Sequence, residues 1–410
     1  MIRAHKIRLN PTPEQAHYFR KAAGTSRFVY NWGLAAWKAH KAAHPGEPHG
    51  PMALKKDFNA LKGEQFPWIY EVAKDVAEGA FTNLAAAMKN YYDSQAGKRS
   101  GRKVGFPHFK TKKKARRTFR LNNDKMHVDD HALYVPKLGW VNMAEALRLS
   151  GKIMGAVVSC KGSHWYVAIT VEMETPPPVD FEKLVVGIDL NLKALMVLSD
   201  GTQRENQTLL RSELTHLKLL ARRLSRCTFG SQRWYRAQER LANFQERIAN
   251  RRADYLHKTT TPIARTFAVV GLEDLNVAGM LKNHHLALSL SDAALGEIRR
   301  QFEYKCAGFG GQVVTVGRFF PSSRLCGTCG AKHDGLTLAD REWVCPACGT
   351  LNQRDANAAR NIEQEVLRLI GKTPVVATSG VKARGGDVRP TSSMAIPVET
   401  RIFERSLLNT

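Results

Sequence analysis

The alternation of apolar and polar residues divides the chain into a helical stretch, a strand-rich stretch and a longer mixed stretch. Residues 2–9 alternate weakly, which predicts a short strand. A helix should begin directly after it, because Thr12 suits the N-cap, Pro13 suits the first helical position and Gln15 completes a capping box. From there to about residue 95 apolar side chains recur at helical spacing, so we expect helices with most of their aromatic residues in a core.

Residues 125–175 follow the two-residue period that is typical of strands. We expect strands around residues 128 and 133–135, and then over 152–159 and 164–172, with a turn at 161–163. Three consecutive prolines at 176–178 form a stiff break, which is the strongest candidate for a domain boundary.

Beyond this break, residues 211–226 and 232–257 have the pattern of two basic amphipathic helices separated at Gly230 and Ser231. Arg222, Arg247 and Arg251 lie on their polar faces, where they could follow a phosphate backbone. A solvated helical hairpin without a ligand is the alternative. The tail at 372–410 is rich in Pro, Gly, Ser and Thr without a sustained period, so we expect it to be disordered.

Three acidic residues stand at the ends of predicted elements. An apolar run at 184–188 ends in Asp189, a second run at 267–272 ends in Glu273, and Asp355 begins a helical segment. A further apolar run at 194–199 predicts a strand beside the first. A carboxylate at the apolar end of a strand usually has a cation, a polar partner or water nearby.

The chemistry that needs several such acids is phosphodiester hydrolysis. Two divalent ions about 3.5–4 Å apart activate a water and stabilise the leaving oxygen, and carboxylates hold hard ions such as Mg²⁺ or Mn²⁺. The three acids therefore indicate a two-metal nuclease on an α/β core. Spacing along the chain does not show that they meet, so strand-capping acids remain the alternative.

Four of the seven cysteines form two Cys-x₂-Cys pairs, Cys326/Cys329 and Cys345/Cys348, separated by residues 330–344. This is the spacing of a four-thiolate zinc site, with redox thiols or an iron–sulfur cluster as alternatives. Four thiolates leave no open coordination position, so we expect a structural zinc ion, and we expect His333 to lie on the surface. The scattered remaining cysteines suit a reducing cytoplasm.

The composition is strongly basic, with 62 Lys and Arg against 37 Asp and Glu and a formal net charge of +25. Such an excess attracts polyanions, and nucleic acid is the expected partner. A membrane surface is disfavoured because no apolar stretch approaches the roughly 20 residues of a span and the N-terminus lacks a signal-peptide core. A basic surface that serves only solubility is the alternative. These features predict a cytoplasmic protein.

The segment 98–120 contains eleven Lys and Arg residues and no acidic residue, with Phe106, Phe109 and Phe119 interleaved. Spaced aromatic residues and glycines favour a folded strand or loop that contacts phosphates over a disordered arm. The candidate nucleic-acid contacts, besides the three arginines of the helices, are Lys98, Arg99, Arg102, Lys103, Lys110, Lys112, Lys113, Arg116 and Arg117.

Four motifs occur in order in the second half: residues 187–191 (GIDLN), 271–275 (GLEDL), the paired cysteines, and 354–362 (RDANAARNI). In the first half, residues 26–31 (SRFVYN) and 105–110 (GFPHFK) add to the set. Together they resemble the TnpB (OrfB) proteins of bacterial insertion sequences, the compact relatives of type V CRISPR effectors. Gln353 departs from many of these relatives, which have an acid two residues before the third catalytic Asp.

The resemblance implies an RNase H-like (RuvC) nuclease domain at 179–320 and 350–371, with a zinc ribbon inserted at 321–349. It also implies a wedge domain, a barrel-like β-structure, at 1–10 and 96–178, split by a helical recognition lobe at 11–95. Asp189, Glu273 and Asp355 would then hold two Mg²⁺ (or Mn²⁺) ions, and the four cysteines zinc.

The implied activity is RNA-guided cleavage of double-stranded DNA beside a short transposon-associated motif. One protein monomer would bind one guide RNA transcribed from the transposon end, and base pairing would read the target sequence. Three alternatives remain: a DDE-type transposase, an RNA-guided DNA-binding repressor without cleavage, and a basic zinc-ribbon protein that binds nucleic acid non-specifically.

Overall fold

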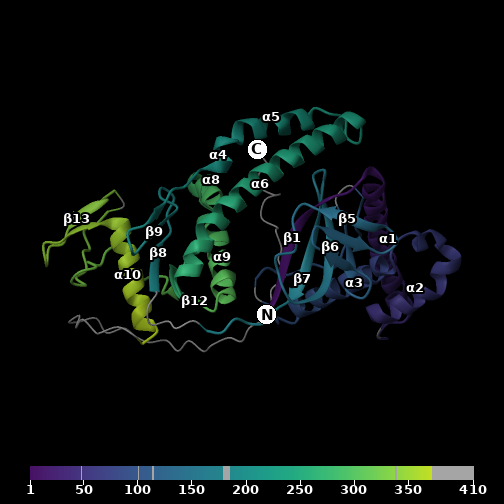
Figure 1. Cartoon of the computed structure of the whole chain (residues 1–410), viewed down its shortest axis with the longest axis horizontal. Helices are drawn as coiled ribbons and strands as arrows, with labels where there is room; N and C mark the ends of the chain where they lie inside the picture. The colour runs from purple at the N-terminus through teal and green to yellow at the C-terminus, as the bar shows by residue number, and fades with distance from the viewer. Residues whose placement is uncertain (48, 100, 113–114, 179–184, 338, 372–410) are drawn as a thin grey trace.

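The computed structural model describes residues 1–47, 49–99, 101–112, 115–178, 185–337 and 339–371 (Figure 1). The tail predicted at 372–410 and the basic residue Lys113 lie outside the described residues. The described strands form a seven-stranded sheet, a five-stranded sheet and a two-stranded ribbon. In Figure 1 the five-stranded sheet lies left of centre and the larger sheet right of centre, with a long helical hairpin above them.

The seven-stranded sheet joins the start of the chain to residues 118–172. β1 (Ile2–Asn10) lies in its middle and pairs antiparallel with both β5 (Gly139–Met143) and β7 (His164–Glu172). β6 (Lys152–Lys161), β2 (Thr118–Asn122), β4 (Ala132–Val135) and β3 (His127–Asp129) complete the order β2-β6-β7-β1-β5-β4-β3. The predicted strands are confirmed, and the hydrogen-bonded order leaves β2 and β3 as edges.

From Pro13 to Gln95 the chain is mainly helical, as predicted. The helices are α1 (Pro13–Ala43), α2 (Pro51–Gln65), the 3₁₀ turn η1 (Pro67–Glu71) and α3 (Lys74–Gln95). Thr12 and Gln15 form the predicted capping box at the start of α1. Phe19 of α1 is fully buried against the sheet, where its ring lies 5.1 Å from that of Trp165.

The five-stranded sheet has the order β10-β9-β8-β11-β12. Its strands are β8 (Val185–Asp189), β9 (Met196–Leu198), β10 (Gln203–Arg204), β11 (Val269–Glu273) and β12 (Gln312–Val316). β11 pairs in parallel with β8 and β12, whereas β9 is antiparallel to β8. This is the α/β arrangement that the sequence predicted for the second half.

Helices cover both faces of this sheet. α10 (Arg354–Leu369) packs on one face, where Ile362 and Val366 meet Val269 and Val316. On the other face, Ile263 of α6 (Gln232–Thr266) and Phe302 of α9 (Leu295–Gly308) pack against Val270 and its neighbours. Two short helices, α7 (Val277–Met280) and α8 (His284–Ala293), complete this layer.

α10 lies unusually close to β8 because Gly187 has no side chain. A Cβ atom built on Gly187 would lie 2.1 Å from the Ala359 carbonyl oxygen and 2.4 Å from the Glu363 nitrogen. Any larger residue would therefore push the helix away from the strand. The contact fixes the middle of α10 against β8.

The basic hairpin consists of α4 (Leu209–Ser212), α5 (Leu214–Ser225) and α6 (Gln232–Thr266). The predicted end of its second helix at 257 was wrong, because α6 continues through Pro262 to Thr266. Ile263 and Ala264 are buried in the core at that point, and this burial maintains the helix. Among the described residues, no helix is long and apolar enough to cross a membrane.

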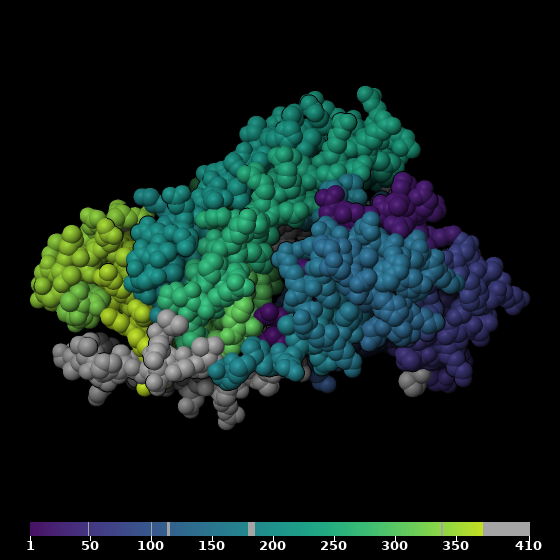
Figure 2. Space-filling model, viewed as in Figure 1, coloured from purple at the N-terminus to yellow at the C-terminus, as the bar shows by residue number. Residues whose placement is uncertain are grey.

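The hairpin also touches the larger sheet. Asn243 of α6 accepts a 2.9 Å hydrogen bond from the Ser163 amide in the β6–β7 turn, and Glu246 lies 2.8 Å from His164 Nδ1. α6 therefore connects the two sheets, which agrees with the ridge that Figure 2 shows above them.

Candidate functional site

The three predicted carboxylates lie around one edge of the five-stranded sheet. β8 and β11 run parallel with Ile188 opposite Leu272, so Asp189 and Glu273 follow at the same end of neighbouring strands. Asp355 stands in the first turn of α10, which packs over that sheet. The Asn191 side-chain amide donates to Asp189 Oδ2 at 3.2 Å and to Asp355 Oδ2 at 3.3 Å. One amide thus joins the strand carboxylate to the helix carboxylate.

Glu273 has a polar partner of its own. The hydroxyl of Ser322 donates a 2.6 Å hydrogen bond to Glu273 Oε1, and Ser322 is only 5% exposed. Ser322 lies in the segment after β12, the strand next to β11, so the contact comes from the chain that leaves that strand. Each of the three carboxylates is therefore held by a neutral polar side chain.

The three carboxylates repel one another. Burial and the negative charges of Glu273 and Asp355 raise the pKa of Asp189 to about 7, although the hydrogen bond from Asn191 opposes the shift. A cation placed among the three would favour the ionised form of Asp189. The donor set, carboxylate oxygens without sulfur or imidazole, is the one that Mg²⁺ and Mn²⁺ take.

Among the described residues, the one group of three or more His, Cys, Asp and Glu side chains close enough to hold a single metal ion is the four cysteines, whose ligand atoms all lie within 4.8 Å of one another.

A fourth acid nearby has different partners. Asp274 follows Glu273 and pairs with Arg299 at 3.0 Å and with Arg318 at 2.7 Å. The hydrogen bond from Arg299, together with Arg318, lowers the pKa of Asp274. Asp274 is thus neutralised by arginines, which separates it from the three carboxylates.

Two asparagines of α10 hold the segment that leads from Ser322 into the first cysteine pair. The Asn361 amide donates to the carbonyl oxygens of Ser322 at 2.6 Å and Leu325 at 2.8 Å. Asn357 donates to the Leu325 oxygen at 2.6 Å and accepts from the Gly327 amide at 2.7 Å. Sequence reasoning missed these roles, although two asparagines four residues apart on one helix were a usable signal.

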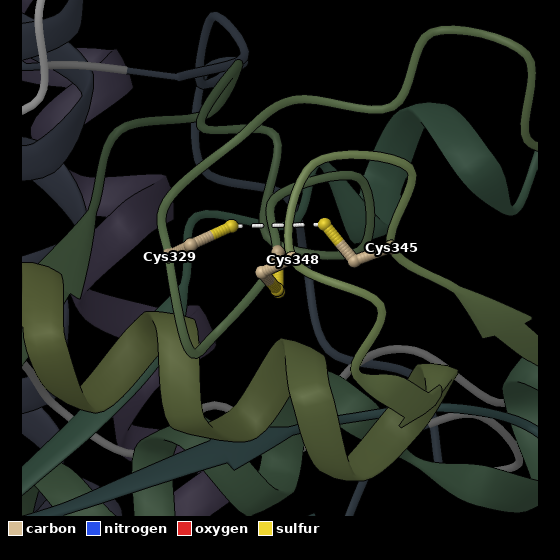
Figure 3. Close-up of side chains that lie close together, drawn as sticks. Cys329, Cys345 and Cys348 are labelled. Atoms are coloured by element: carbon tan, nitrogen blue, oxygen red, sulfur yellow. Dashed lines mark hydrogen bonds between the residues drawn. The ribbon is translucent and has the colours of Figure 1, made fainter.

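The four cysteines converge as their spacing predicts. The sulfur atoms of Cys326 and Cys348 are 3.7 Å apart. Those of Cys329 and Cys345 are 3.6 Å apart (Figure 3). Four thiolates about 2.3 Å from a tetrahedral zinc ion would be separated by about 3.8 Å. The cluster therefore fits a structural zinc ion.

The two cysteine turns have the same backbone geometry. Gly330 donates to the Cys326 carbonyl and Gly349 to the Cys345 carbonyl, both at 2.8 Å, and each glycine has a φ of 72°. This left-handed conformation explains why glycine follows each pair. β13 (Glu342–Val344) and β14 (Leu351–Gln353) form the ribbon between this cluster and α10.

The side chains around the ribbon include two residues that the sequence singled out. His333 lies outside the cysteine group and packs its ring against Trp343. Gln353, at the N-cap of α10, donates to Glu342 at 3.3 Å instead of contacting the carboxylates.

The basic segment before β2 is folded in its described part. Phe119 is fully buried, and Phe106 packs against the rings of Trp37 and Tyr91. Lys110 differs from the other basic residues, because it is partly buried over the Tyr30 ring and burial lowers its pKa to about 8. The remaining described candidates of this segment are exposed: Lys98, Arg99, Arg102, Lys103, Lys112, Arg116 and Arg117.

The candidate arginines of the hairpin are exposed as well, but two of them share an acidic partner. Arg247 and Arg251 contact Glu213 at 3.2 and 2.8 Å. Arg222 is exposed on α5. A phosphate backbone would compete with Glu213 for the first two arginines.

Three family models match the chain. OrfB_IS605, described as "Probable transposase", matches residues 168–284. The Cas12f1-like TNB domain matches residues 296–362, which include the four cysteines, and the OrfB_IS605 helix-turn-helix domain matches residues 1–44.

Relatives with similar sequences cover nearly the whole chain. A Streptomyces pristinaespiralis protein is 33% identical over 367 residues, which are 88% of this chain and 88% of that protein. InsQ of Escherichia coli (strain K12) is 31% identical over 380 residues, which are 88% of this chain and 91% of InsQ. The names of both contain the words RNA-guided DNA endonuclease.

One solved structure has a similar fold. It is entitled "Cryo-EM structure of the Cas12f1-sgRNA-target DNA complex", and it matches with a TM-score of 0.52 at 13% identity. The match covers 86% of this chain and 83% of that chain. At this identity the likeness concerns the fold alone.

Proposed function

The chain belongs to the TnpB (OrfB) family of RNA-guided DNA endonucleases, and we propose that Asp189, Glu273 and Asp355 are its catalytic carboxylates. The observation that carries the proposal is the shared Asn191 amide, which joins Asp189 to Asp355 beside Glu273 on the neighbouring strand. These acids come from two strand ends and one helix start, so only the folded chain gathers them.

The surrounding residues set the orientation of the carboxylates. Asn191 engages the Oδ2 atoms of Asp189 and Asp355, and Ser322 engages Oε1 of Glu273, so the three groups have defined rotations. Two bound divalent ions, Mg²⁺ or Mn²⁺, would supply the activation of water and the stabilisation of the leaving oxygen. Fixed ligand rotations reduce the reorganisation that the reaction requires.

We propose that the five-stranded sheet and α10 are an RNase H-like (RuvC) nuclease domain, and that residues 321–349 are an inserted zinc ribbon. The seven-stranded sheet would be the wedge domain, and the helices of 11–95 would be the recognition lobe. The parallel strands β8, β11 and β12 beneath α10 support the first assignment. The cysteine cluster supports the second.

The proposed partners are a guide RNA from the end of the encoding transposon and double-stranded DNA beside a short adjacent motif. The +25 net charge and the exposed basic residues of 98–117 support a polyanionic partner. Sequencing the RNA that copurifies with the protein tests the first partner. A homogeneous RNA from the transposon end is expected, and random fragments would contradict the proposal.

The cleavage assignment is tested with Asp189→Ala in the protein–RNA complex. We expect the variant to bind target DNA as the unchanged protein does but to cut it at least about 1000-fold more slowly, since metal ligation is lost. Asp200→Ala is a matched control, because Asp200 is an exposed acid of the same sheet region that follows β9. Undiminished cutting by Asp189→Ala would refute the site.

The same assay separates the alternatives. Binding without cutting by the unchanged protein would favour an RNA-guided repressor. Joined transposon ends formed without RNA would favour a transposase.

A further inference from the structure

The loop after β12 exposes an aromatic ring. Phe319 is 93% exposed, the highest value among the exposed large apolar side chains of the described residues. Single exposed apolar residues are common on protein surfaces and need no ligand to explain them. What distinguishes Phe319 is the way in which its neighbours are held.

The residues on both sides of Phe319 are anchored. Arg318 donates to Asp274 Oδ2 at 2.7 Å, and Phe320 packs into the cluster beneath α10. The Phe320 amide donates to the Gly317 carbonyl at 2.9 Å, which closes a turn around residues 317–320. Ser322 is bound to Glu273 two residues later. The exposure of the ring is therefore imposed by fixed neighbours and does not reflect a loose loop.

This loop lies at the edge of the sheet that carries the carboxylates. Val316, the last residue of β12, is the register partner of Glu273, and Phe319 follows it by three residues. Two exposed arginines add positive charge to this region. Arg324 is five residues after Phe319 in the chain, and Arg341 lies 3.7 Å from Asp355 Oδ1. A ligand that offers both phosphates and flat apolar faces matches this surface. Nucleic acid is such a ligand.

We propose that Phe319 is a base-stacking subsite: one unpaired base of the DNA strand being cut stacks on its ring and sets the register of that strand at the carboxylates. The inference rests on the proposed function of Asp189, Glu273 and Asp355. A base inside a duplex is covered on both faces by its neighbours, so the ring requires an unpaired base. Stacking is tolerant of sequence because every base has a π face, which suits an enzyme whose guide reads the target.

The first experiment measures single-turnover cutting by preassembled protein–RNA complexes on target DNA with a pre-opened strand. Phe319→Ala is expected to cut about 5- to 150-fold more slowly, the range for loss of one stacked base. Phe319→Tyr should cut at the rate of the unchanged protein because it keeps the ring. Phe319→Leu keeps an apolar side chain without a ring, and it should resemble Phe319→Ala. A Leu variant as fast as the unchanged protein would overturn stacking.

Removing one base of the DNA tests the same contact as removing the ring of Phe319. Abasic nucleotides are placed one at a time around the cut position. One of them should slow the unchanged protein by about the factor that Phe319→Ala does, and it should not slow Phe319→Ala further. Two effects that multiply at every position would overturn the proposal. So would equal cutting rates for Phe319→Ala and the unchanged protein.

A second readout does not depend on cutting. In the Asp189→Ala background, 2-aminopurine at the identified position, or at each position in turn, should be quenched on complex formation. The quenching should disappear when Phe319→Ala is added. No quenching at any position, or quenching that Phe319→Ala leaves unchanged, would overturn the subsite. If the quenching is seen but the unchanged protein, with Asp189 present, never cuts DNA, the result would contradict the proposed function alone and leave the stacking subsite standing.

Discussion

Ser322 donates a 2.6 Å hydrogen bond to Glu273 from a segment that reaches the first cysteine of the cluster four residues later. Asn361 of α10 binds the carbonyl of the same Ser322. The carboxylate edge, the helix that carries Asp355 and the cysteine cluster therefore share one short stretch of chain. Residues 322–327 therefore connect all three.

Removing the Ser322 hydroxyl should weaken metal binding at the proposed nuclease centre without unfolding the protein. In Ser322→Ala, Glu273 loses the donor that fixes its rotation, so we expect a higher Mg²⁺ concentration for half-maximal cutting. Loss of a residue that orients a metal ligand typically costs about 10- to 100-fold in affinity or activity. A Mg²⁺ titration of cutting measures the shift, with Ser323→Ala as the neighbouring control. Identical titration curves for Ser322→Ala and the unchanged protein would contradict the role.

The pKa of Asp189 predicts how the metal-free protein responds to pH. Its folded value of about 7 lies above the ordinary value of about 3.9 for an aspartate. Between these values the folded state binds more protons than the unfolded state, so stability falls as pH rises from about 4 to 7. Asp189→Asn cannot ionise and should escape this loss. We expect it to be more stable than the unchanged protein at pH 8, by up to about 4 kcal/mol, and equally stable near pH 4.

The measurement is thermal or denaturant unfolding in Mg²⁺-free buffer across that pH range. Asp200→Asn, at an exposed position, controls for the general loss of one charge. Added Mg²⁺ should stabilise the unchanged protein at pH 8 much more than Asp189→Asn. Parallel profiles of stability against pH for the two proteins would show that the pKa of Asp189 is not raised in the folded protein.

Much of the fold could be predicted from local patterns. The capping box at Thr12 and the strand before Asp189 depend on neighbouring residues, and the cysteine turns depend on spacings of two residues and on glycine. Such features depend on residues only a few positions apart in the sequence. The end of α6 could not be predicted in this way, because burial of Ile263 in the core of the sheet extends the helix through Pro262.

The meeting of the carboxylates could not be predicted from spacing. It depends on the parallel pairing of β8 with β11 and on the close approach of α10 at Gly187, both of which join distant parts of the chain. Ser322 is an ordinary polar residue in the sequence, and only its contact with Glu273 gives it a role. The pairing of Arg247 with Glu213 was hidden for the same reason.

Loss of zinc should disturb the carboxylates as well as the ribbon. Cys345→Ser removes one of four thiolates, and structural zinc sites contribute directly to folding. Residues 322–327 then lose the anchor at Cys326, which loosens the Ser322 contact with Glu273. We expect bound zinc to fall and the Mg²⁺-induced rise in melting temperature to shrink, even without RNA or DNA.

Metal analysis and calorimetry with and without Mg²⁺ check this prediction. Cys227→Ser is the matched control, because Cys227 lies in the loop between α5 and α6, outside the cluster. An unchanged Mg²⁺ effect in zinc-depleted protein would show that the two metal sites are independent.

Adding one methyl group at Gly187 should separate α10 from β8. In Gly187→Ala the new Cβ would lie 2.1 Å from the Ala359 carbonyl oxygen, so helix or strand must move. Overpacking of this kind typically costs about 1–3 kcal/mol. Because α10 carries Asp355, we expect lower stability together with slower cutting at limiting Mg²⁺.

Gly296→Ala in α9 is the control for this variant. The Cβ atom added at Gly296 would meet no atom within 4 Å, so this substitution should leave stability equal or slightly higher. Denaturant unfolding measures the stability, and a Mg²⁺ titration of cutting measures the activity. If Gly187→Ala has the same stability and the same titration curve as Gly296→Ala, the close approach of α10 to β8 does not position Asp355.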